Sequence, residues 1–231
     1  VLRVDETTGR SIATSMRADL AGGWAEVRSR TWLWVVLLQF ALLVGLGEAA
    51  FDVLAPVVAR DRLGGASAFG VLLAVEAAGA VAGGVIALRL RLKRPMFAGV
   101  AAMALFSPEL LLLAAGAPFA LLLPAAALAG LAVQLFIVVW DTALQDHIPP
   151  QALSRVAAYD AFGSTILLPV GLAVMGPLAA WIGVGGALVV GAAGVVVPTL
   201  AALCVREVRT LPRVEHARPA HKSAMLGADK F

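Results

Sequence analysis

The sequence predicts an all-α integral membrane protein with six transmembrane helices. Three observations predict this fold class: the composition, the stretches with few or no charges, and the placement of the basic residues. Of 231 residues, 61% are hydrophobic and 14% are charged, and the mean hydropathy is +0.91. Soluble domains carry about 45–50% apolar and about 25% charged residues, so a soluble enzyme, a disordered chain and a coiled coil are disfavoured.

Six apolar stretches are each long enough to cross a bilayer, which requires roughly 20 mostly apolar residues. The Gly-Ala-Pro at 116–118 and the glycines at 183, 185 and 186 are turn signals, and each divides a longer apolar stretch into two spans. The predicted spans, which together form a transmembrane domain over 32–205, are residues 32–58, 66–88, 96–114, 119–141, 156–180 and 184–205.

The basic residues gather in alternate loops, as the positive-inside rule requires of cytoplasmic loops. Most of them lie on one side of the membrane: in the segment before the first span, in the 89–94 loop, at Arg155 and in the segment after 205. The opposite side carries only Arg60 and Arg62. We therefore expect a multi-pass protein of the plasma (inner) membrane with both termini in the cytoplasm. These loops also account for the pI near 9.6, so we expect the lipid bilayer and not nucleic acid as a partner.

The segments that flank the spans have their own patterns. Residues 1–31 are predicted to form a cytoplasmic linker, in which 16–30 has apolar residues at the spacing of an amphipathic surface helix. A solvated linker is the alternative for 16–30, because its two adjacent glycines weaken a helix. Residues 206–231 form a cytoplasmic tail rich in Pro, Arg, His and Lys, which we expect to be poorly ordered.

Polar side chains inside the spans are the candidate binding residues, since an Asp at the centre of a membrane helix costs about 2.5–3.5 kcal/mol. Glu48 and Asp52 lie one turn apart on the first span and share a face. Glu76 lies at a comparable depth in the second span, and Gln134 lies in the fourth. The acids are candidates for binding a substrate cation or protons. The alternatives are contact with water in an outer vestibule and, for Glu48 and Asp52, pairing with Arg60 or Arg62. For Gln134 the alternative is a hydrogen bond between helices.

Two further features accompany these candidates. Glu109 follows Pro108 in the third span and faces either the interior or an interfacial notch. Gly79 and Gly83 form a G-x-x-x-G, the spacing that allows two membrane helices to approach closely. We interpret these glycines as packing residues.

Charged residues also cluster at the predicted cytoplasmic mouth. Asp141, Arg155 and Asp160 lie opposite the basic loop that contains Arg89 and Arg91. We expect ion pairs among them to close an inner gate. A solvated loop of unpaired charges is the alternative.

Motifs for catalysis are absent from the sequence. It contains no G-x-S-x-G, no H-E-x-x-H and no P-loop. Its single cysteine, Cys204, forms neither an internal disulfide nor a metal site alone. We expect no enzymatic activity, no catalytic residue, no metal and no cofactor.

Two sequence blocks resemble a known family. They are ADLAGGW at 18–24 followed by RSRTWLW at 28–34, and WDTALQDHIPP at 140–150 followed by LSRV at 153–156. Over about residues 17–205 the chain resembles the C-terminal half, helices seven to twelve, of major facilitator superfamily transporters of the actinobacterial drug- and macrolide-efflux branch. The resemblance implies a 3+3 helix repeat, with the first and fourth spans lining a central cavity.

The resemblance also implies a function. It indicates half of a secondary active transporter, a proton-coupled antiporter that exports small molecules by alternating access. Because six helices of such a transporter are missing, we expect the chain to be incomplete alone and to pair with an N-terminal six-helix half or with a second copy. The alternative is a non-transporting membrane subunit or a degenerate half-transporter. The family's loop aspartate is absent after Gly84, and Asp160 is the candidate to replace it.

Overall fold

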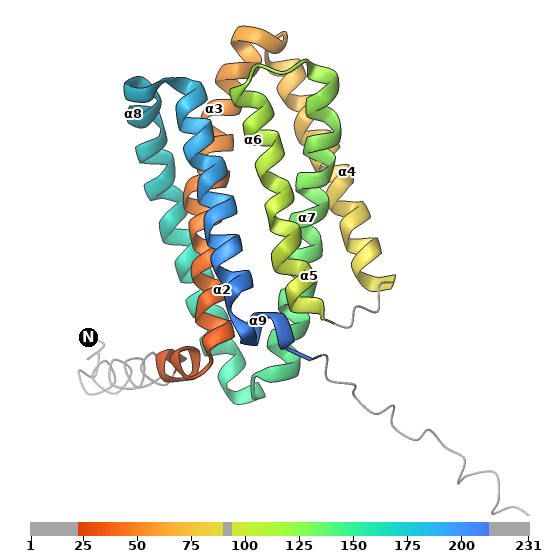
Figure 1. Ribbon diagram of the computed structural model, residues 1–231, viewed down its shortest axis with the longest axis vertical. Coiled ribbons are helices and arrows are strands. Elements are labelled where there is room, and N and C mark those ends of the chain that lie inside the picture. The colour runs from red at the N-terminus through yellow and green to blue at the C-terminus, as the bar shows by residue number, and fades with distance from the viewer. Residues whose placement is uncertain (1–22, 90–93, 213–231) are drawn as a thin grey trace, which may run out of the picture.

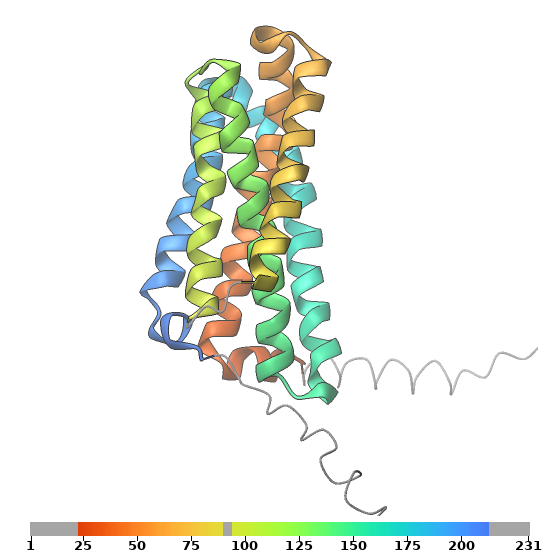
Figure 2. The same cartoon turned by 90° about the vertical axis from the view of Figure 1, so that its right-hand side faces the viewer.

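The computed structural model describes residues 23–89 and 94–212, and the regular secondary structure in these ranges is entirely helical. Five helical segments in this part of the chain are long and apolar enough to cross a membrane: Thr31–Leu63, Ala66–Arg89, Pro95–Ala114, Phe119–His147 and Pro150–Cys204. They stand side by side as a bundle whose two described chain ends lie at the same end (Figure 1), and they run along its long axis in the turned view (Figure 2).

The first segment is a continuous helix with two π-helical turns. It comprises α2 (Thr31–Leu42), η1 (Leu43–Glu48), α3 (Ala49–Val58) and η2 (Ala59–Leu63). It ends at Gly64, whose φ of 100° is accessible to glycine at little steric cost. A π-helical turn holds an extra residue, so η1 changes which side chains of this segment face the interior.

The second and fourth segments are the uninterrupted helices α4 (Ala66–Arg89) and α7 (Phe119–His147). The third comprises α5 (Pro95–Ala102), a 3₁₀ turn η3 (Met103–Phe106) and α6 (Ser107–Ala114). The predicted spans 66–88 and 96–114 match these bounds to within a residue. The fourth was predicted to end at 141, but α7 continues to His147 because the first helix-breaking signal, Pro149, comes only then.

The prediction of six separate spanning helices is wrong in one respect. The last two predicted spans, 156–180 and 184–205, are the two legs of the single element α8 (Pro150–Cys204). The chain turns back at Gly183, which has φ 82° and ψ 157°, and Figure 1 shows the two legs running in opposite directions. The turn is so short that it leaves no loop between the legs. The expected 3+3 repeat stays a prediction.

Glycines bring α4 and α7 into backbone contact. A Cβ added at Gly79 or Gly83 of α4 would collide with the backbone oxygen of Ala127 or Leu131 on α7. One added at Gly130 of α7 would collide with the backbone oxygen of Glu76. The structure therefore supports the interpretation of the G-x-x-x-G as a packing motif.

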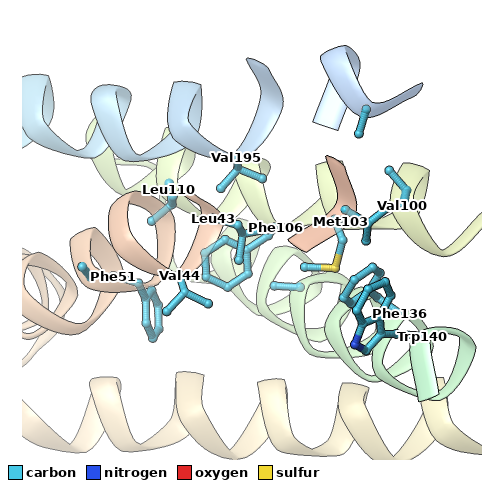
Figure 3. Packing of buried hydrophobic residues seen from close by; sticks show 14 of the residues in the cluster. Leu43, Val44, Phe51, Val100, Met103, Phe106, Leu110, Phe136, Trp140 and Val195 are labelled. Atoms are coloured by element: carbon cyan, nitrogen blue, oxygen red, sulfur yellow. The ribbon is translucent and has the colours of Figure 1, made fainter. Parts of the chain in front are cut away.

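A layer of buried apolar side chains runs through the bundle, as Figure 3 shows. Phe136 stacks on both Phe40 and Trp140, with ring centroids 5.2 and 6.1 Å away. Large apolar side chains also cover the outside, where Leu88 is 82% and Trp181 84% exposed. An outer surface of this kind is suited to lipid, so the helices identify the chain as a candidate multi-pass membrane protein.

Two short helices lie at the end of the bundle that holds the described chain ends. Residues 23–29 form a helix in which Val27 is buried and Trp24 lies 5.9 Å, between ring centroids, from Tyr159. Residues 16–22 of the predicted surface helix lie outside the described residues. In the predicted tail, Arg206–Thr210 forms α9, and Glu207 accepts a hydrogen bond of 3.0 Å from the backbone N–H of Trp32. Residues 213–231 lie outside the described part.

Candidate functional site

Three of the predicted acids meet at one cavity of about 250 Å³. Glu48 and Asp52 come from the first spanning segment, and Glu76 comes from α4. The remaining lining residues are apolar or aromatic, and they are Phe40, Leu43, Phe51, Leu73, Phe106 and Val133.

The local structure of the first segment places its two acids. Glu48 is the last residue of the π-helical turn η1, and Asp52 lies in the first turn of α3. Gly45 in this turn approaches α8 so closely that a Cβ on Gly171 would collide with its backbone oxygen. The close contact holds the turn against α8, which leaves Glu48 half-buried and Asp52 exposed at the cavity.

A second close contact positions Glu76. Its backbone oxygen lies where a Cβ on Gly130 would have to be, so α4 and α7 are in backbone contact at this level of the bundle. Val133, less than one turn after Gly130, completes the cavity wall on α7. The Glu76 side chain is half-buried.

Aromatic rings form much of the cavity wall. The rings of Phe51 and Phe106 meet edge to face, with centroids 6.3 Å apart and an interplanar angle of 68°. Figure 3 shows both within the buried apolar layer. The negative faces of such rings attract cations, and their bodies pack against apolar surface.

The ionisable side chains that line the cavity are all acidic, and no basic side chain is among its lining residues. Within the described residues, the three carboxylates form neither an ion pair nor a hydrogen bond. The predicted alternative partners for Glu48 and Asp52 are engaged elsewhere: Arg60 donates to Asp61 over 2.9 Å, and Arg62 lies against Gly116. The arrangement can therefore accept positive charge from outside the chain, as protons or as a cationic group.

Gln134 does not line the cavity. It packs on α4, where its Cγ would lie 3.5 Å from a Cβ added at Gly84. The structure thus brings together Glu48, Asp52 and Glu76. Gln134 lies next to the cavity residue Val133 on α7 but does not line the cavity itself.

The buried polar side chains that were not among the predicted site residues include Glu109 and Gln39. Glu109 in α6 is 0% exposed, and neither of its carboxylate oxygens has a hydrogen-bond partner within the described residues. Gln39 in α2 is 2% exposed and donates from Nε2 to the Thr199 hydroxyl over 3.2 Å. The sequence held a signal for Gln39, since it is the one amide or charged side chain between residues 32 and 47.

The predicted inner gate is described in part. Trp140 donates from Nε1 to Asp160 Oδ2 over 2.9 Å, and Arg155 donates to the backbone oxygen of Gln151 over 3.1 Å. Asp141 is exposed, and Arg89 is the last residue of α4. Arg91 lies outside the described residues. Asp160 is therefore held by an indole N–H, and the gating ion pairs stay a prediction.

Comparison of the chain with known protein families, with curated proteins and with solved structures finds no match. The family resemblance consequently stays an expectation from the sequence, and the argument for function rests on the cavity.

Proposed function

We propose that this chain is half of a secondary active transporter that exports small amphipathic molecules in exchange for protons by alternating access. The observation that carries the proposal is the cavity at which three carboxylates from two spanning segments meet among aromatic rings, with no basic side chain in its lining. Carboxylates that lack protein partners in a low-dielectric region are costly. Protons and cationic groups compete to neutralise them, and that competition is the basis of an antiport cycle.

The cavity is one-sided in the single chain, which favours the proposal of a half. Asp52 is exposed, so the bundle closes around the acids only in part. A second bundle across this opening would complete the enclosure that alternating access requires. That second bundle is an N-terminal six-helix half or another copy of this chain.

The test is a flux measurement on a defined oligomer. The oligomeric state of the purified chain is first determined from its native mass in mild detergent, alone and with a candidate N-terminal six-helix half. The resulting species is then placed in liposomes that contain a pH-sensitive dye. Under a pH gradient, addition of a lipophilic cation is expected to release protons through the wild-type protein. Glu48→Gln, Asp52→Asn and Glu76→Gln are expected to reduce this release, whereas Glu26→Gln, outside the cavity, serves as the matched control.

Two outcomes contradict the proposal. If all three cavity variants keep the wild-type proton release, these acids are not the coupling site. If every oligomeric species inserts and none moves protons or cation, the chain is a non-transporting membrane subunit.

A further inference from the structure

A second concave site lies on the other side of α2, between this helix and the last leg of α8. It is a groove of about 370 Å³, within the range of about 300–1,000 Å³ that is typical of small-molecule sites. Leu38 of α2 and Val197 and Ala201 of α8 are among the side chains that give it an apolar wall. Trp34 and Leu38 are exposed, so the groove opens to the surface that faces lipid.

Gln39 is the one amide in this wall, and a hydrogen-bond argument fixes its orientation. The Thr199 hydroxyl donates its single hydrogen to the backbone oxygen of Val195 over 2.7 Å. Toward Gln39 it can therefore only accept, so the group that faces it at 3.2 Å is the amide nitrogen. The amide oxygen points elsewhere.

That oxygen has no hydrogen-bond donor among the described residues. Most buried polar atoms in folded proteins have a protein or water partner, and a buried acceptor without one is destabilising. The groove wall next to Gln39 is apolar apart from the indole N–H of Trp34, and this N–H makes no hydrogen bond to the amide oxygen. The oxygen is buried, and Gln39 is itself one of the residues that line the groove, so a donor bound in the groove lies beside this amide.

We propose that this groove binds an apolar molecule that carries one hydrogen-bond donor, and that a long-chain primary alcohol is the matching chemistry. The hydrocarbon chain lies along Leu38, Val197 and Ala201, and the hydroxyl donates to Gln39 Oε1. Gln39 lies eight residues into the helix, about 12 Å from its start at 1.5 Å per residue. The hydroxyl of the bound molecule therefore lies at the depth of the acyl chains. This depth favours a hydroxyl compound that dissolves in the bilayer interior and disfavours a lipid whose headgroup stays at the membrane surface.

The site is independent of the acidic cavity and of the proposed transport. Phe40, the residue after Gln39, lines the acidic cavity, so consecutive residues of α2 face the two sites. The groove contains no charged side chain, and a ligand in it needs no proton exchange.

Photolabelling with a matched pair of probes tests the proposal. The chain in lipid nanodiscs is irradiated with a diazirine-bearing alkanol or with its methyl ether, in which a methyl group replaces the hydroxyl hydrogen and removes the donor. The labelled peptides are sequenced by mass spectrometry. We expect the alkanol to label α2 and the last leg of α8 about two- to tenfold more than the ether, the ratio that one neutral hydrogen bond supports.

Variants then assign the effect to one side chain. Gln39→Leu is expected to lower alkanol labelling to the level of the ether, and Gln134→Leu, the same change on α7, to leave it unaltered. Equal labelling of the wild-type groove by both probes would overturn the proposal and indicate an apolar surface filled by lipid. Absence of label from these two helices would overturn it as well. Both of these outcomes are read on the wild-type protein, so neither depends on how a variant folds.

Discussion

The contact between α4 and α7 allows a quantitative test of how the cavity is held. In Gly130→Ala, the new Cβ would collide with the backbone oxygen of Glu76, and it would lie 2.8 Å from the carbonyl carbon of Glu76 and 3.0 Å from the nitrogen of Ala80. Every one of these atoms is backbone, so no flexible side chain can move aside. The two helices must separate, which also loosens the contacts at Gly79 and Gly83.

The expected magnitude is the difference between two opposing effects. Overpacking a well-packed contact costs about 1–3 kcal/mol, and the rigid backbone places this case in the upper half of that range. Alanine in place of glycine returns roughly 0.5–1 kcal/mol of helix stability. We therefore expect Gly130→Ala to lower the free energy of unfolding by about 1–2.5 kcal/mol.

Gly70→Ala is the matched control, because Gly70 lies in α4 and a Cβ there meets nothing within 4 Å. The assay is reversible unfolding in mixed micelles by titration with a denaturing detergent, followed by tryptophan fluorescence. Gly70→Ala is expected to be neutral or stabilising. The reasoning is refuted if Gly130→Ala is as stable as Gly70→Ala, since α4 and α7 would then not be in backbone contact.

The same assay checks three further predictions. Glu109→Leu is expected to be neutral or to raise the free energy of unfolding by about 1–3 kcal/mol, because it removes a fully buried carboxyl group without a partner; a loss of stability would show that Glu109 has a partner. Gly183→Ala is expected to lower the free energy of unfolding by about 1–3 kcal/mol, because residues other than glycine avoid the backbone conformation φ 82°, ψ 157°. Gly176→Ala is the control, because a Cβ at Gly176 meets nothing within 4 Å. A double-mutant cycle of Trp140→Phe and Asp160→Ala is expected to give a coupling energy of about 1.5–3 kcal/mol for their hydrogen bond, and a coupling near zero would contradict it.

Composition and charge spacing were sufficient to predict the helical class and where the first four spans begin. The predicted starts of the first four spans lie within a residue of the observed ones, because apolar stretches bounded by Arg, Pro or Gly leave few alternatives. Sequence could not reveal that the last two spans meet at one residue. Gly183 is followed by two more glycines, and only the three-dimensional structure distinguishes the one that adopts a positive φ.

The grouping of the acids was predictable only within one helix. Helical spacing relates Glu48 to Asp52, but the distance from either to Glu76 depends on how two helices pack. That packing is set by backbone contacts at Gly45 and Gly130, and their contact residues lie at least 50 residues away in the sequence. The same limit applies to Gln134, since the position of a residue along one helix does not show whether its side chain borders a cavity formed with other helices.

The three cavity acids lack ion-pair and hydrogen-bond partners among the described residues, and this bears on why the chain contains them. A buried acid that stabilises a fold does so through an ion pair or hydrogen bonds, and Glu48, Asp52 and Glu76 make neither with any described residue. Each of them nevertheless lies within a segment that is long and apolar enough to span the membrane, where acids are costly to insert. Their contribution to stability is therefore unfavourable, and a binding role accounts for them better than a structural one. On this argument, replacing the three together with Gln, Asn and Gln should raise the stability of the isolated chain while abolishing its response to a cationic ligand. A triple variant that unfolds more easily than the wild type would show that the acids are structural after all.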